Sequence, residues 1–417
     1  MSKNIVGIIA EYNPLHNGHF HHLLRAREES DAEGAVVVLS SHFVQRGEPA
    51  MVDKWTRTAM ALACGADVVL ELPTAFSCHN AGVFANAAVD LLAGLGVVTH
   101  VAFGMEDPQA DLENLTSVLL QEPETFKLAL QRFLREGFSF VESRSRALET
   151  LISGSAALLR GANNTLALAY ACRIRSRGYT MEPVPIQRVG AGYHHQTLEP
   201  FSSATAVRAA LRQGNWQSLA QTVPPASAAL LHRARDAERL VLDFDFLGRL
   251  ARFLISRLGI EGLRGMAEMR EGFEHRLLDA AGRALSWEEL VGRCVSRRYP
   301  RGRVQRHMVH VLLGLGHWEN RALQRLGPPY LRVLGTNARG REILRQARRC
   351  ATLPLIAKAS PPPGREAQLV MALEHRAAAL WELGLPHPEA ETEARRRVVL
   401  WEEFRQERPA ASEESLS

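Results

Sequence analysis

Short apolar runs alternate with amphipathic stretches through the first half of the chain. Runs that are apolar on both faces are typical of strands buried in a parallel sheet, and the stretches between them have helical spacing. The pattern predicts strands at Ile5–Ala10, Ala35–Leu39, Asp67–Leu72, Val97–Phe103 and Pro183–Arg188. It predicts helices at His19–Glu29, Lys54–Cys64 and Asn80–Gly94, and a mainly helical insertion at Pro108–Arg160. We therefore expect an α/β fold, with a parallel sheet covered by helices.

The pattern changes near Pro224, beyond which only helical spacing is evident. The expected helical stretches are Ala226–Gly259, Leu277–Val295, Gln305–Leu315, Gly340–Cys350 and Gln368–Leu383. The sequence thus predicts two domains, an α/β domain over residues 1–223 and a mainly helical domain over residues 224–417. A length of 417 residues is sufficient for two separate cores.

The composition narrows the class of protein further. No apolar run reaches the roughly 18 residues of a membrane helix, and the N-terminus lacks the features of a signal peptide. The five cysteines are scattered, with no C-x-x-C pair, which argues against a disulfide framework or a zinc ribbon. We expect a soluble, cytoplasmic protein with no membrane partner.

The strongest local motif is His16-Asn-Gly-His19, which follows the first strand and an Asn13-Pro14 turn. Ligands of doubly wound sheets bind at the carboxyl ends of strands, and a helix N-terminus there favours phosphate. Two histidines three residues apart lie on one side of a helical turn. The motif therefore indicates a phosphate site, and the alternative is two surface histidines after an ordinary strand and turn.

Other residues at predicted strand ends and helix starts favour the same site. Ser203 and Thr205 begin a helix whose first turns carry Arg208, which is a second anion site or simply a capped helix. Gly104 ends the fourth strand and leaves room for a ribose or a base, and Arg188 ends the last strand. Asn163 and Asn164 precede a helical run, where one of them suits helix capping better than ligand contact.

The formal charge of +5 is distributed unevenly. Only four lysines occur, and the stretch from Ser296 to Cys350 carries 13 arginines against two acids, Glu319 and Glu342. Arg297, Arg298, Arg301, Arg303 and Arg306 surround Tyr299, and a second cluster comprises Arg339, Arg341, Arg345, Arg348 and Arg349. Concentrated positive charge beside an aromatic ring indicates RNA binding. The alternative is a solvated arginine-rich face.

The motifs together resemble a known family. The H-x-G-H opening is similar to that of the nucleotidyltransferase superfamily, and a longer series of segments resembles the bacterial tRNA(Met) cytidine acetate ligases. These segments are Ser41–Pro49, Asp53–Arg57, Leu70–Pro73, Phe103-Gly104, Asn163-Asn164, Arg188, Gly192–His194, Phe201–Arg208 and the stretch around Tyr299. Ser41 departs from the family's pattern, which has a glycine there, so its side chain is expected to narrow the approach to a phosphate.

The resemblance implies a Rossmann-like domain that activates acetate with ATP as acetyl-adenylate. The acetyl group then passes to N4 of the wobble cytidine of elongator methionine tRNA. It implies catalytic roles for His16, His19 and Lys54, and Mg²⁺ with the nucleotide, for which no cluster of carboxylates identifies a protein ligand. The implied ATP-binding residues are Gly7, Ile8, Ile9, Ala10, Glu11, Tyr12, Asn13, Pro14, Leu15, His16, Asn17, Gly18, His19, Phe20, Gly104, Asn163, Asn164, Arg188, Ser203, Thr205 and Arg208. The implied tRNA-binding residues are Arg297, Arg298, Tyr299, Arg301, Arg303 and Arg306.

Two other functions remain open at this point. An adenylyltransferase for a small metabolite explains the H-x-G-H motif but leaves the basic half unused. A non-catalytic RNA-binding protein explains the arginines but not the pair of phosphate motifs. No obligate protein partner is evident.

Overall fold

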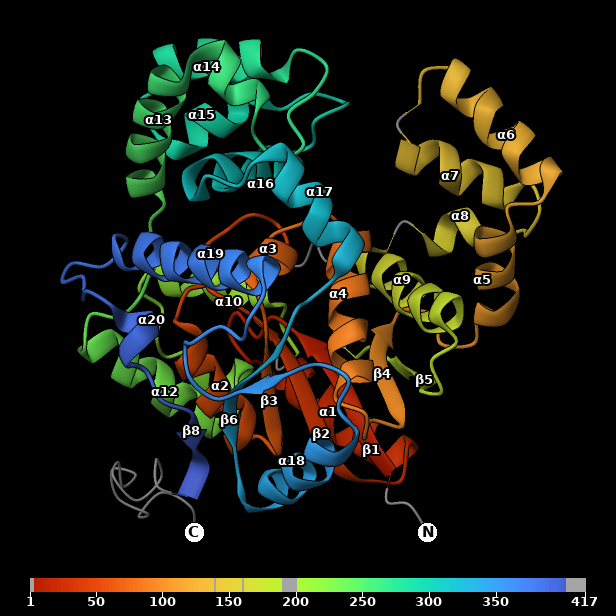
Figure 1. Cartoon of the computed structure of the whole chain (residues 1–417), viewed down its shortest axis with the longest axis vertical. Helices are drawn as coiled ribbons and strands as arrows, with labels where there is room; N and C mark the ends of the chain where they lie inside the picture. Colours follow the sequence, from red (N-terminus) through yellow and green to blue (C-terminus); the bar gives the residue numbers. More distant parts are fainter. Residues whose placement is uncertain (1–3, 139, 160, 190–200, 403–417) are drawn as a thin grey trace.

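The computed structural model describes residues 4–138, 140–159, 161–189 and 201–402. Their strands form an eight-stranded sheet of order β5-β4-β1-β2-β3-β6-β7, with β8 paired to β6 (Figure 1). The strands are β1 (Asn4–Ala10), β2 (Ala32–Ser40), β3 (Val68–Leu72), β4 (His100–Met105), β5 (Glu182–Gln187), β6 (Leu331–Thr336), β7 (Leu355–Ile356) and β8 (Val399–Leu400). The first five are mutually parallel. The α/β fold and the five predicted strands are confirmed, although β4 begins at His100 rather than Val97.

Helices cover both faces of this sheet, because successive side chains of each strand point to opposite faces. One face packs against α1 (Asn17–Glu29), α2 (Lys54–Ala63), α10 (Ala204–Arg212), α11 (Leu219–Thr222) and α12 (Pro225–Asp236). The other packs against α3 (Thr74–Ser77), α4 (Ala81–Gly94), α9 (Ala162–Arg177) and α18 (Ala338–Cys350). In β1, for example, Ile8 belongs to the first core and Ile5 to the second.

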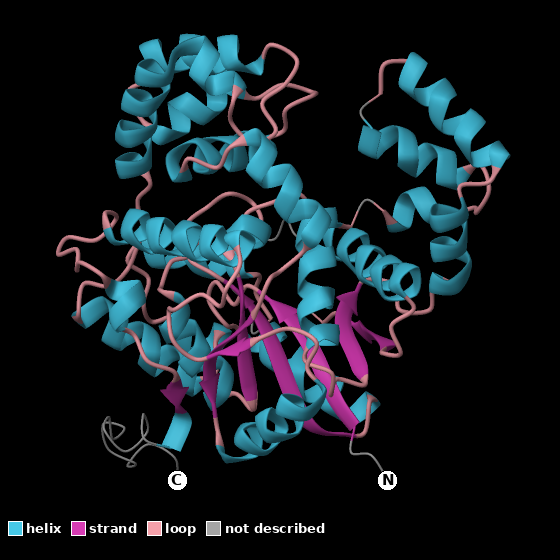
Figure 2. Ribbon diagram, in the orientation of Figure 1, coloured by secondary structure: helices cyan, strands magenta, loops and turns pink. Residues whose placement is uncertain are grey.

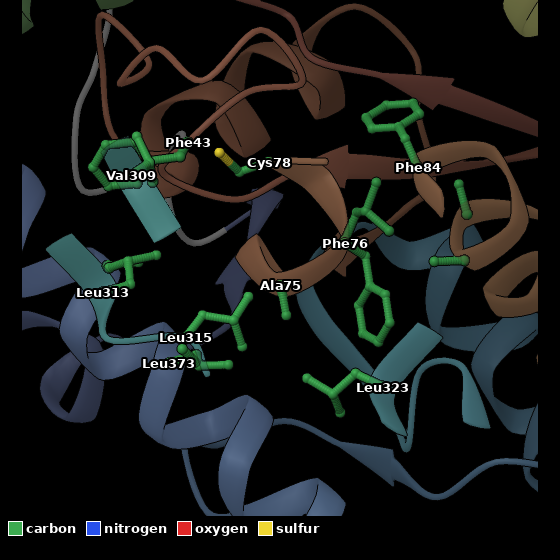
Figure 3. Packing of buried hydrophobic residues seen from close by; sticks show 14 of the residues in the cluster. Phe43, Ala75, Phe76, Cys78, Phe84, Val309, Leu313, Leu315, Leu323 and Leu373 are labelled. Carbon is green, nitrogen blue, oxygen red and sulfur yellow. The ribbon is translucent and has the colours of Figure 1, made fainter. Parts of the chain in front are cut away.

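Two helical lobes stand beyond the carboxyl ends of the parallel strands (Figures 1 and 2). The predicted insertion forms one, with its own small core, from α5 (Leu112–Gln121), α6 (Glu124–Arg135), α7 (Phe140–Glu149) and α8 (Ser155–Leu158). The other contains α13 (Asp245–Arg264), α14 (Phe273–Arg283), α15 (Trp287–Cys294), α16 (Arg301–Leu313) and α17 (His317–Leu326). This second lobe and α19 (Arg365–Glu382) pack on α3. Leu313 and Leu373 belong to the same hydrophobic core as Phe76 and Cys78 (Figure 3).

The expectation that strands end before Pro224 is wrong. Strand β6 lies antiparallel to β3, with Val68 opposite Thr336, and the short strands β7 and β8 pair with β6. The run Leu331–Thr336 is fully buried, but Arg332 interrupts its apolar pattern and arginine-rich helices flank it. The C-terminal part of the chain therefore adds strands to the N-terminal sheet, so this sheet contains residues from both sides of the predicted boundary at residue 223.

A buried cluster of charged side chains joins β6 and the C-terminal helices to the parallel strands. The Lys54 ammonium, at the start of α2, pairs with Glu71 of β3, with Glu374 of α19 at 3.3 Å, and with Glu393 at 2.7 Å. Glu393 lies in α20 (Thr392–Arg395) and also pairs with Arg332, which is 3.4 Å from Glu71. Each of these five side chains is at most 2% exposed.

This cluster contains one more carboxylate than it has cations. Two cations face three carboxylates, and burial raises the pKa of Glu374 to about 7, with the nearby Glu71 acting in the same direction. Lys54 and Arg332 instead hold the pKa values of Glu71 and Glu393 low against the opposing effect of burial. The Ser41 hydroxyl donates to Glu374 inside this cluster and is fully buried. Ser41 therefore does not narrow the approach to a phosphate, contrary to the expectation.

No helix among the described residues is both long enough and apolar enough to cross a membrane. All five cysteines are free thiols.

The cluster leads to a prediction about stability. Replacing Lys54 with methionine leaves buried carboxylates without their counter-charge, which destabilises proteins by about 3–5 kcal/mol. We expect Lys54→Met to lower the free energy of unfolding, measured with urea, by about this amount. Lys127→Met, an exposed control on α6, is expected to change it by no more than about 0.5 kcal/mol. Equal stability of the two variants, with loss of ATP binding in Lys54→Met alone, would restore the catalytic role implied for Lys54.

Candidate active site

The turn after β1 places His16 and His19 together at the start of α1. His16 is the N-cap: its Nδ1 accepts from the Gly18 N–H at 3.0 Å, and His19 Nδ1 accepts from the His16 N–H at 3.4 Å. The two imidazoles stack with ring centroids 3.7 Å apart. A Cβ at residue 18 would lie 2.9 Å from His16 Cε1, so only glycine leaves this ring in place. The H-x-G-H motif is thus a reciprocal helix cap built from two imidazoles.

Both histidines are neutral at pH 7. Burial lowers the pKa of His16 to about 3, and the positive charges of Arg188 and Arg208 lower it further. Burial also holds the pKa of His19 well below its usual value, with smaller contributions from His16 and Arg188. Since Nδ1 of His16 accepts a hydrogen bond, the single proton of its neutral imidazole lies on Nε2, while the Pro14 carbonyl acts as an acceptor for the His19 ring. The pair therefore offers N–H donors, and the positive charge of the site comes from arginine.

A third histidine, His22, continues the same row one turn along α1. Burial lowers its pKa to about 4, with Arg188 acting in the same direction, and its buried Nε2 has no hydrogen-bond partner among the described residues. The sequence analysis overlooked His22, although the spacing 16, 19, 22 places all three histidines on one side of the helix.

Two arginines from distant parts of the chain flank these histidines. Arg188, exposed just after β5, lies over Gly104 of β4, where a Cβ would come 3.1 Å from its Cγ. Arg208 of α10 donates from Nη1 to the Asn13 carbonyl at 2.8 Å, across the turn that follows β1. Its Nη2 donates to Thr205 Oγ1 at 3.4 Å and lies 3.6 Å from Glu48. The structure thus brings Arg208 beside the histidine turn.

Helix α10 begins as its sequence predicts. Ser203 is the N-cap, and its hydroxyl accepts from the Ala206 N–H at 3.3 Å. Asn17, at the start of α1, donates to the carbonyl of Gln221 at 2.8 Å, which holds the segment after α10 against α1. Two helix N-termini and two arginines therefore converge at one edge of the sheet, which is an arrangement suited to an anion with several negative charges.

The two asparagines serve the fold next to this site. Gly161, rather than an asparagine, is the N-cap of α9, so the predicted capping role is wrong. Asn164 is buried, accepts from the Glu106 N–H at 3.0 Å and donates to the Leu158 carbonyl at 2.9 Å. Asn163 donates to the Glu106 carboxylate at 2.9 Å. The pair holds the segment that follows β4.

Several residues of the implied ATP and catalytic set lie inside the protein, among them Tyr12 and Leu15, which are at most 1% exposed. Gly7 packs toward Leu92 of α4, Ile8 is buried in the sheet, and Lys54 belongs to the buried charged cluster. A side chain with no exposed surface cannot touch a ligand, so the structure does not bring the Lys54 ammonium to the phosphates. The segment Gly192–His194 lies outside the described residues.

Arg57 holds the backbone next to the site through hydrogen bonds to carbonyl groups. The sequence analysis did not single it out. Its buried guanidinium donates to the carbonyls of Val52 at 3.1 Å, Glu11 and Ser40 at 2.8 Å, and Ser41 at 2.6 Å. Burial lowers the pKa of Arg57 to about 10, so it remains a cation at neutral pH. One side chain thereby fixes the carboxyl ends of both β1 and β2.

The predicted RNA-binding arginines occupy different environments. Arg297 and Arg298 are exposed, with Arg298 3.1 Å from Glu271, and Arg301 pairs with Glu288 at 2.6 Å. Arg306 is mostly buried and donates to the Gln45 carbonyl at 3.2 Å, while the Gln45 N–H donates to Glu11 at 2.8 Å. The start of α16 therefore borders the active site through the Gln45–Gly47 loop.

Tyr299 does not present its ring to a ligand. It is 5% exposed, stacks on Phe273 with centroids 4.3 Å apart, and donates its hydroxyl to the Arg270 carbonyl at 2.8 Å. Arg303 covers the ring, with its Cζ 4.2 Å from the centroid. The expectation that Tyr299 stacks on a base is therefore wrong, because the ring belongs to the core of the lobe.

The second arginine cluster lies elsewhere. It belongs to α18, which packs near the amino ends of β1 and β2, where Arg339 pairs with Glu33 at 3.0 Å (Figure 1). The two clusters therefore lie at opposite ends of the parallel strands, and only the one near α16, at the carboxyl ends, borders His16 and His19.

Comparison with known proteins agrees with this geometry. The chain matches the family model described as HIGH Nucleotidyl Transferase over residues 3–396. It is 36% identical to the tRNA(Met) cytidine acetate ligase of Syntrophomonas wolfei over 92% of this chain and 95% of that protein. It is 39% identical to that of Syntrophotalea carbinolica over 85% of each. It is also similar to the crystal structure of Thermotoga maritima TmcAL bound with α-thio ATP, at a TM-score of 0.89, 28% identity, and coverage of 95% and 99% of the two chains.

The sheet, the histidine cap and the arginines at the carboxyl edge define a HIGH nucleotidyltransferase. Within that class, the chain belongs to the tRNA(Met) cytidine acetate ligase family.

The burial of His16 generates a prediction about pH. Its pKa of about 3 in the folded protein compares with about 6.5 in an unfolded chain. Between these values the unfolded chain binds more protons, so stability is complete above about pH 6.5 and falls as the pH decreases. His16→Asn keeps a helix-capping side chain and removes the titrating group. Urea unfolding between about pH 4.5 and 6 should show a slope smaller by up to about 1.4 kcal/mol per pH unit than in the unaltered protein. Equal slopes would contradict a buried neutral His16.

Proposed function

We propose that this protein is an ATP-dependent ligase that forms acetyl-adenylate from acetate and ATP and acetylates N4 of the wobble cytidine of elongator tRNA(Met). The observation that carries the proposal is the convergence of His16, His19, Arg188 and Arg208 at the carboxyl edge of the sheet. The chain also aligns along almost its whole length with an enzyme of this family solved with an ATP analogue. We place the reaction in the cytoplasm, where its tRNA substrate is found.

The first step needs positioning and electrostatic stabilisation rather than a covalent nucleophile. An acetate oxygen attacks the α-phosphorus, the bond to the bridging oxygen breaks, and pyrophosphate leaves. Negative charge on the phosphate oxygens is met by imidazole N–H donors and by the two arginines, of which Arg208 is held by the Asn13 carbonyl before the substrate binds. The neutral imidazoles cost little desolvation in a buried site, and the arginines supply the permanent charge.

Mg²⁺ is expected to accompany the nucleotide. The described residues contain two groups of three potential metal ligands. One of them, Glu71, Glu374 and Glu393, already surrounds Lys54 and Arg332, and the other lies in the lobe with α16. Neither group lies at His16 and His19. We therefore propose that the nucleotide phosphates and water hold this ion, as is usual for Mg²⁺.

In the second step the N4 amine of the cytidine attacks the acetyl carbonyl, and AMP leaves as the amine loses a proton. The cytidine must therefore reach the same edge of the sheet as the phosphates. Arg297, Arg298 and Arg301 lie at the start of α16, which contacts the loop that also touches Glu11. We propose that these exposed arginines bind the tRNA backbone there.

The histidine cap generates a prediction that separates catalysis from folding. His16→Asn retains a capping side chain but lacks the imidazole Nε2–H that would extend to the phosphate. Acetate-dependent ATP–pyrophosphate exchange should therefore fall by about 10²–10³-fold. His16→Ala should fall as far and also lose about 1 kcal/mol of stability, because asparagine caps a helix and alanine does not. His275→Asn, at an exposed position on α14, is the control and should retain exchange. Full exchange by His16→Asn would refute the role, and exchange independent of acetate would favour an adenylyltransferase for another metabolite.

The arginine surface generates a second prediction, with a control matched in charge. Replacing Arg297, Arg298 and Arg301 with glutamine should weaken tRNA binding and flatten its dependence on log salt by about 0.7–0.9 per lost phosphate contact. Pyrophosphate exchange should continue while acetylation of tRNA fails. The control replaces the exposed Arg345, Arg348 and Arg349 of α18, which changes the net charge equally but near the amino ends of the strands, away from the histidines. Equal loss of tRNA affinity in the two triple variants would mean that only overall charge matters.

A further inference from the structure

A group of two buried histidines and one partly exposed glutamate in the α13–α17 lobe has the composition of a metal site and takes no part in the proposed reaction. Glu268 lies in the loop between α13 and α14, and His307 and His310 lie three residues apart on α16. One carboxylate oxygen and one nitrogen from each imidazole lie within 4.8 Å of one another. Two imidazoles and one carboxylate form a common ligand set for catalytic and structural transition metals.

The imidazole nitrogens of this group lack the partners that buried nitrogens normally have. His307 and His310 are each at most 1% exposed. Neither ring nitrogen of His307, nor Nδ1 of His310, has a hydrogen-bond partner of normal geometry among the described residues. A buried polar atom without a partner carries the full cost of its desolvation, and two such rings beside a carboxylate indicate a ligand-binding group.

The surroundings of His310 fix the ring in the form that binds a metal. Its Nε2 lies 2.9 Å from the Cys78 carbonyl, which can only accept, so Nε2 carries the proton and Nδ1 keeps its lone pair. Metal-binding histidines commonly donate their other N–H to a carbonyl in this way.

The neighbouring His79 differs from these two rings. Its Nδ1 accepts from the Asn80 N–H at 2.8 Å, so its proton lies on Nε2, which donates to Asn320 at 3.2 Å. His79 is therefore already satisfied by the protein, although its Nε2 is 3.8 Å from Glu268. Two arginines lie near the group: Arg306 donates to the Gln45 carbonyl and interacts electrostatically with Glu268, and Arg303 lies over Tyr299.

We propose that Glu268, His307 and His310 bind one divalent transition-metal ion, for which Zn²⁺ is the best match, with water in the remaining position. Ligands about 2.1 Å from one tetrahedral ion lie about 3.4 Å apart, so side-chain shifts of about 1 Å complete the site. The ion would join the α13–α14 loop to α16, whose His310 contacts the segment after α3. Its role would be structural, holding the lobe onto the sheet.

The test measures binding of Zn²⁺ to the full-length protein. After treatment with a chelator and addition of Zn²⁺, elemental analysis of the dialysed protein should give one ion per chain, and the melting temperature should rise with Zn²⁺ concentration. Co²⁺ in place of Zn²⁺ should give visible absorption bands. Glu268→Gln and His310→Gln should each weaken Zn²⁺ binding by at least about 10–100-fold and abolish the rise in melting temperature. The exposed His275→Gln is the control and should bind one ion.

Circular dichroism shows whether each variant is folded, and His307→Gln serves if either of the others is not. Less than stoichiometric Zn²⁺ in the unaltered protein, or a melting temperature that Zn²⁺ leaves unchanged, would overturn the proposal. Retention of the ion by all folded variants of the three ligands would also overturn it, since the metal would then be bound elsewhere. Mg²⁺ supplied alone should give neither stoichiometric binding nor a rise in melting temperature, because it prefers oxygen ligands.

Discussion

The fold depends on one buried set of ion pairs, in which Lys54 and Arg332 face Glu71, Glu374 and Glu393. These side chains come from α2, β6, β3, α19 and α20, so the set connects the first strands to the last helices. Buried charges are tolerated only when every one of them is paired, and this makes the arrangement of the five elements mutually dependent. The C-terminal part is for this reason built into the N-terminal sheet, and the lobe that it carries stays beside the active site.

The active site uses its two kinds of polar side chain differently. Burial keeps the imidazoles of His16 and His19 neutral, and the two rings cap the start of α1. Arg188 and Arg208 supply charge that does not depend on pH near neutrality. Arg57 holds the carboxyl ends of β1 and β2, and β1 leads into the turn that carries the histidines. The catalytic geometry therefore rests on hydrogen bonds formed before any substrate binds, which is the condition for electrostatic stabilisation of a transition state.

The sequence predicted best where the signal was local. Strands β1 to β5 and the helices between them follow from apolar periodicity, and the H-x-G-H cap and the Ser203 cap follow from residue type and spacing. The predictions failed where the deciding neighbour was distant in the chain. Arg332 concealed the apolar pattern of β6 because its charge is neutralised by carboxylates on other elements. Tyr299 was interpreted as exposed among arginines because its packing on Phe273 cannot be read from the stretch around it.

The sequence by itself determined the α/β class, the strand–turn–helix that carries the two histidines, the likeness to one ligase family, and the presence of two arginine-rich segments. Tertiary structure alone decided that Lys54 is a structural ion pair, that His22 joins the histidine row beside Arg188, and that only one arginine cluster borders the site. It also brought Glu268 to His307 and His310. The physical reason is that spacing fixes which residues share a turn or a strand, whereas burial and the pairing of charges depend on contacts between segments that only the completed fold creates.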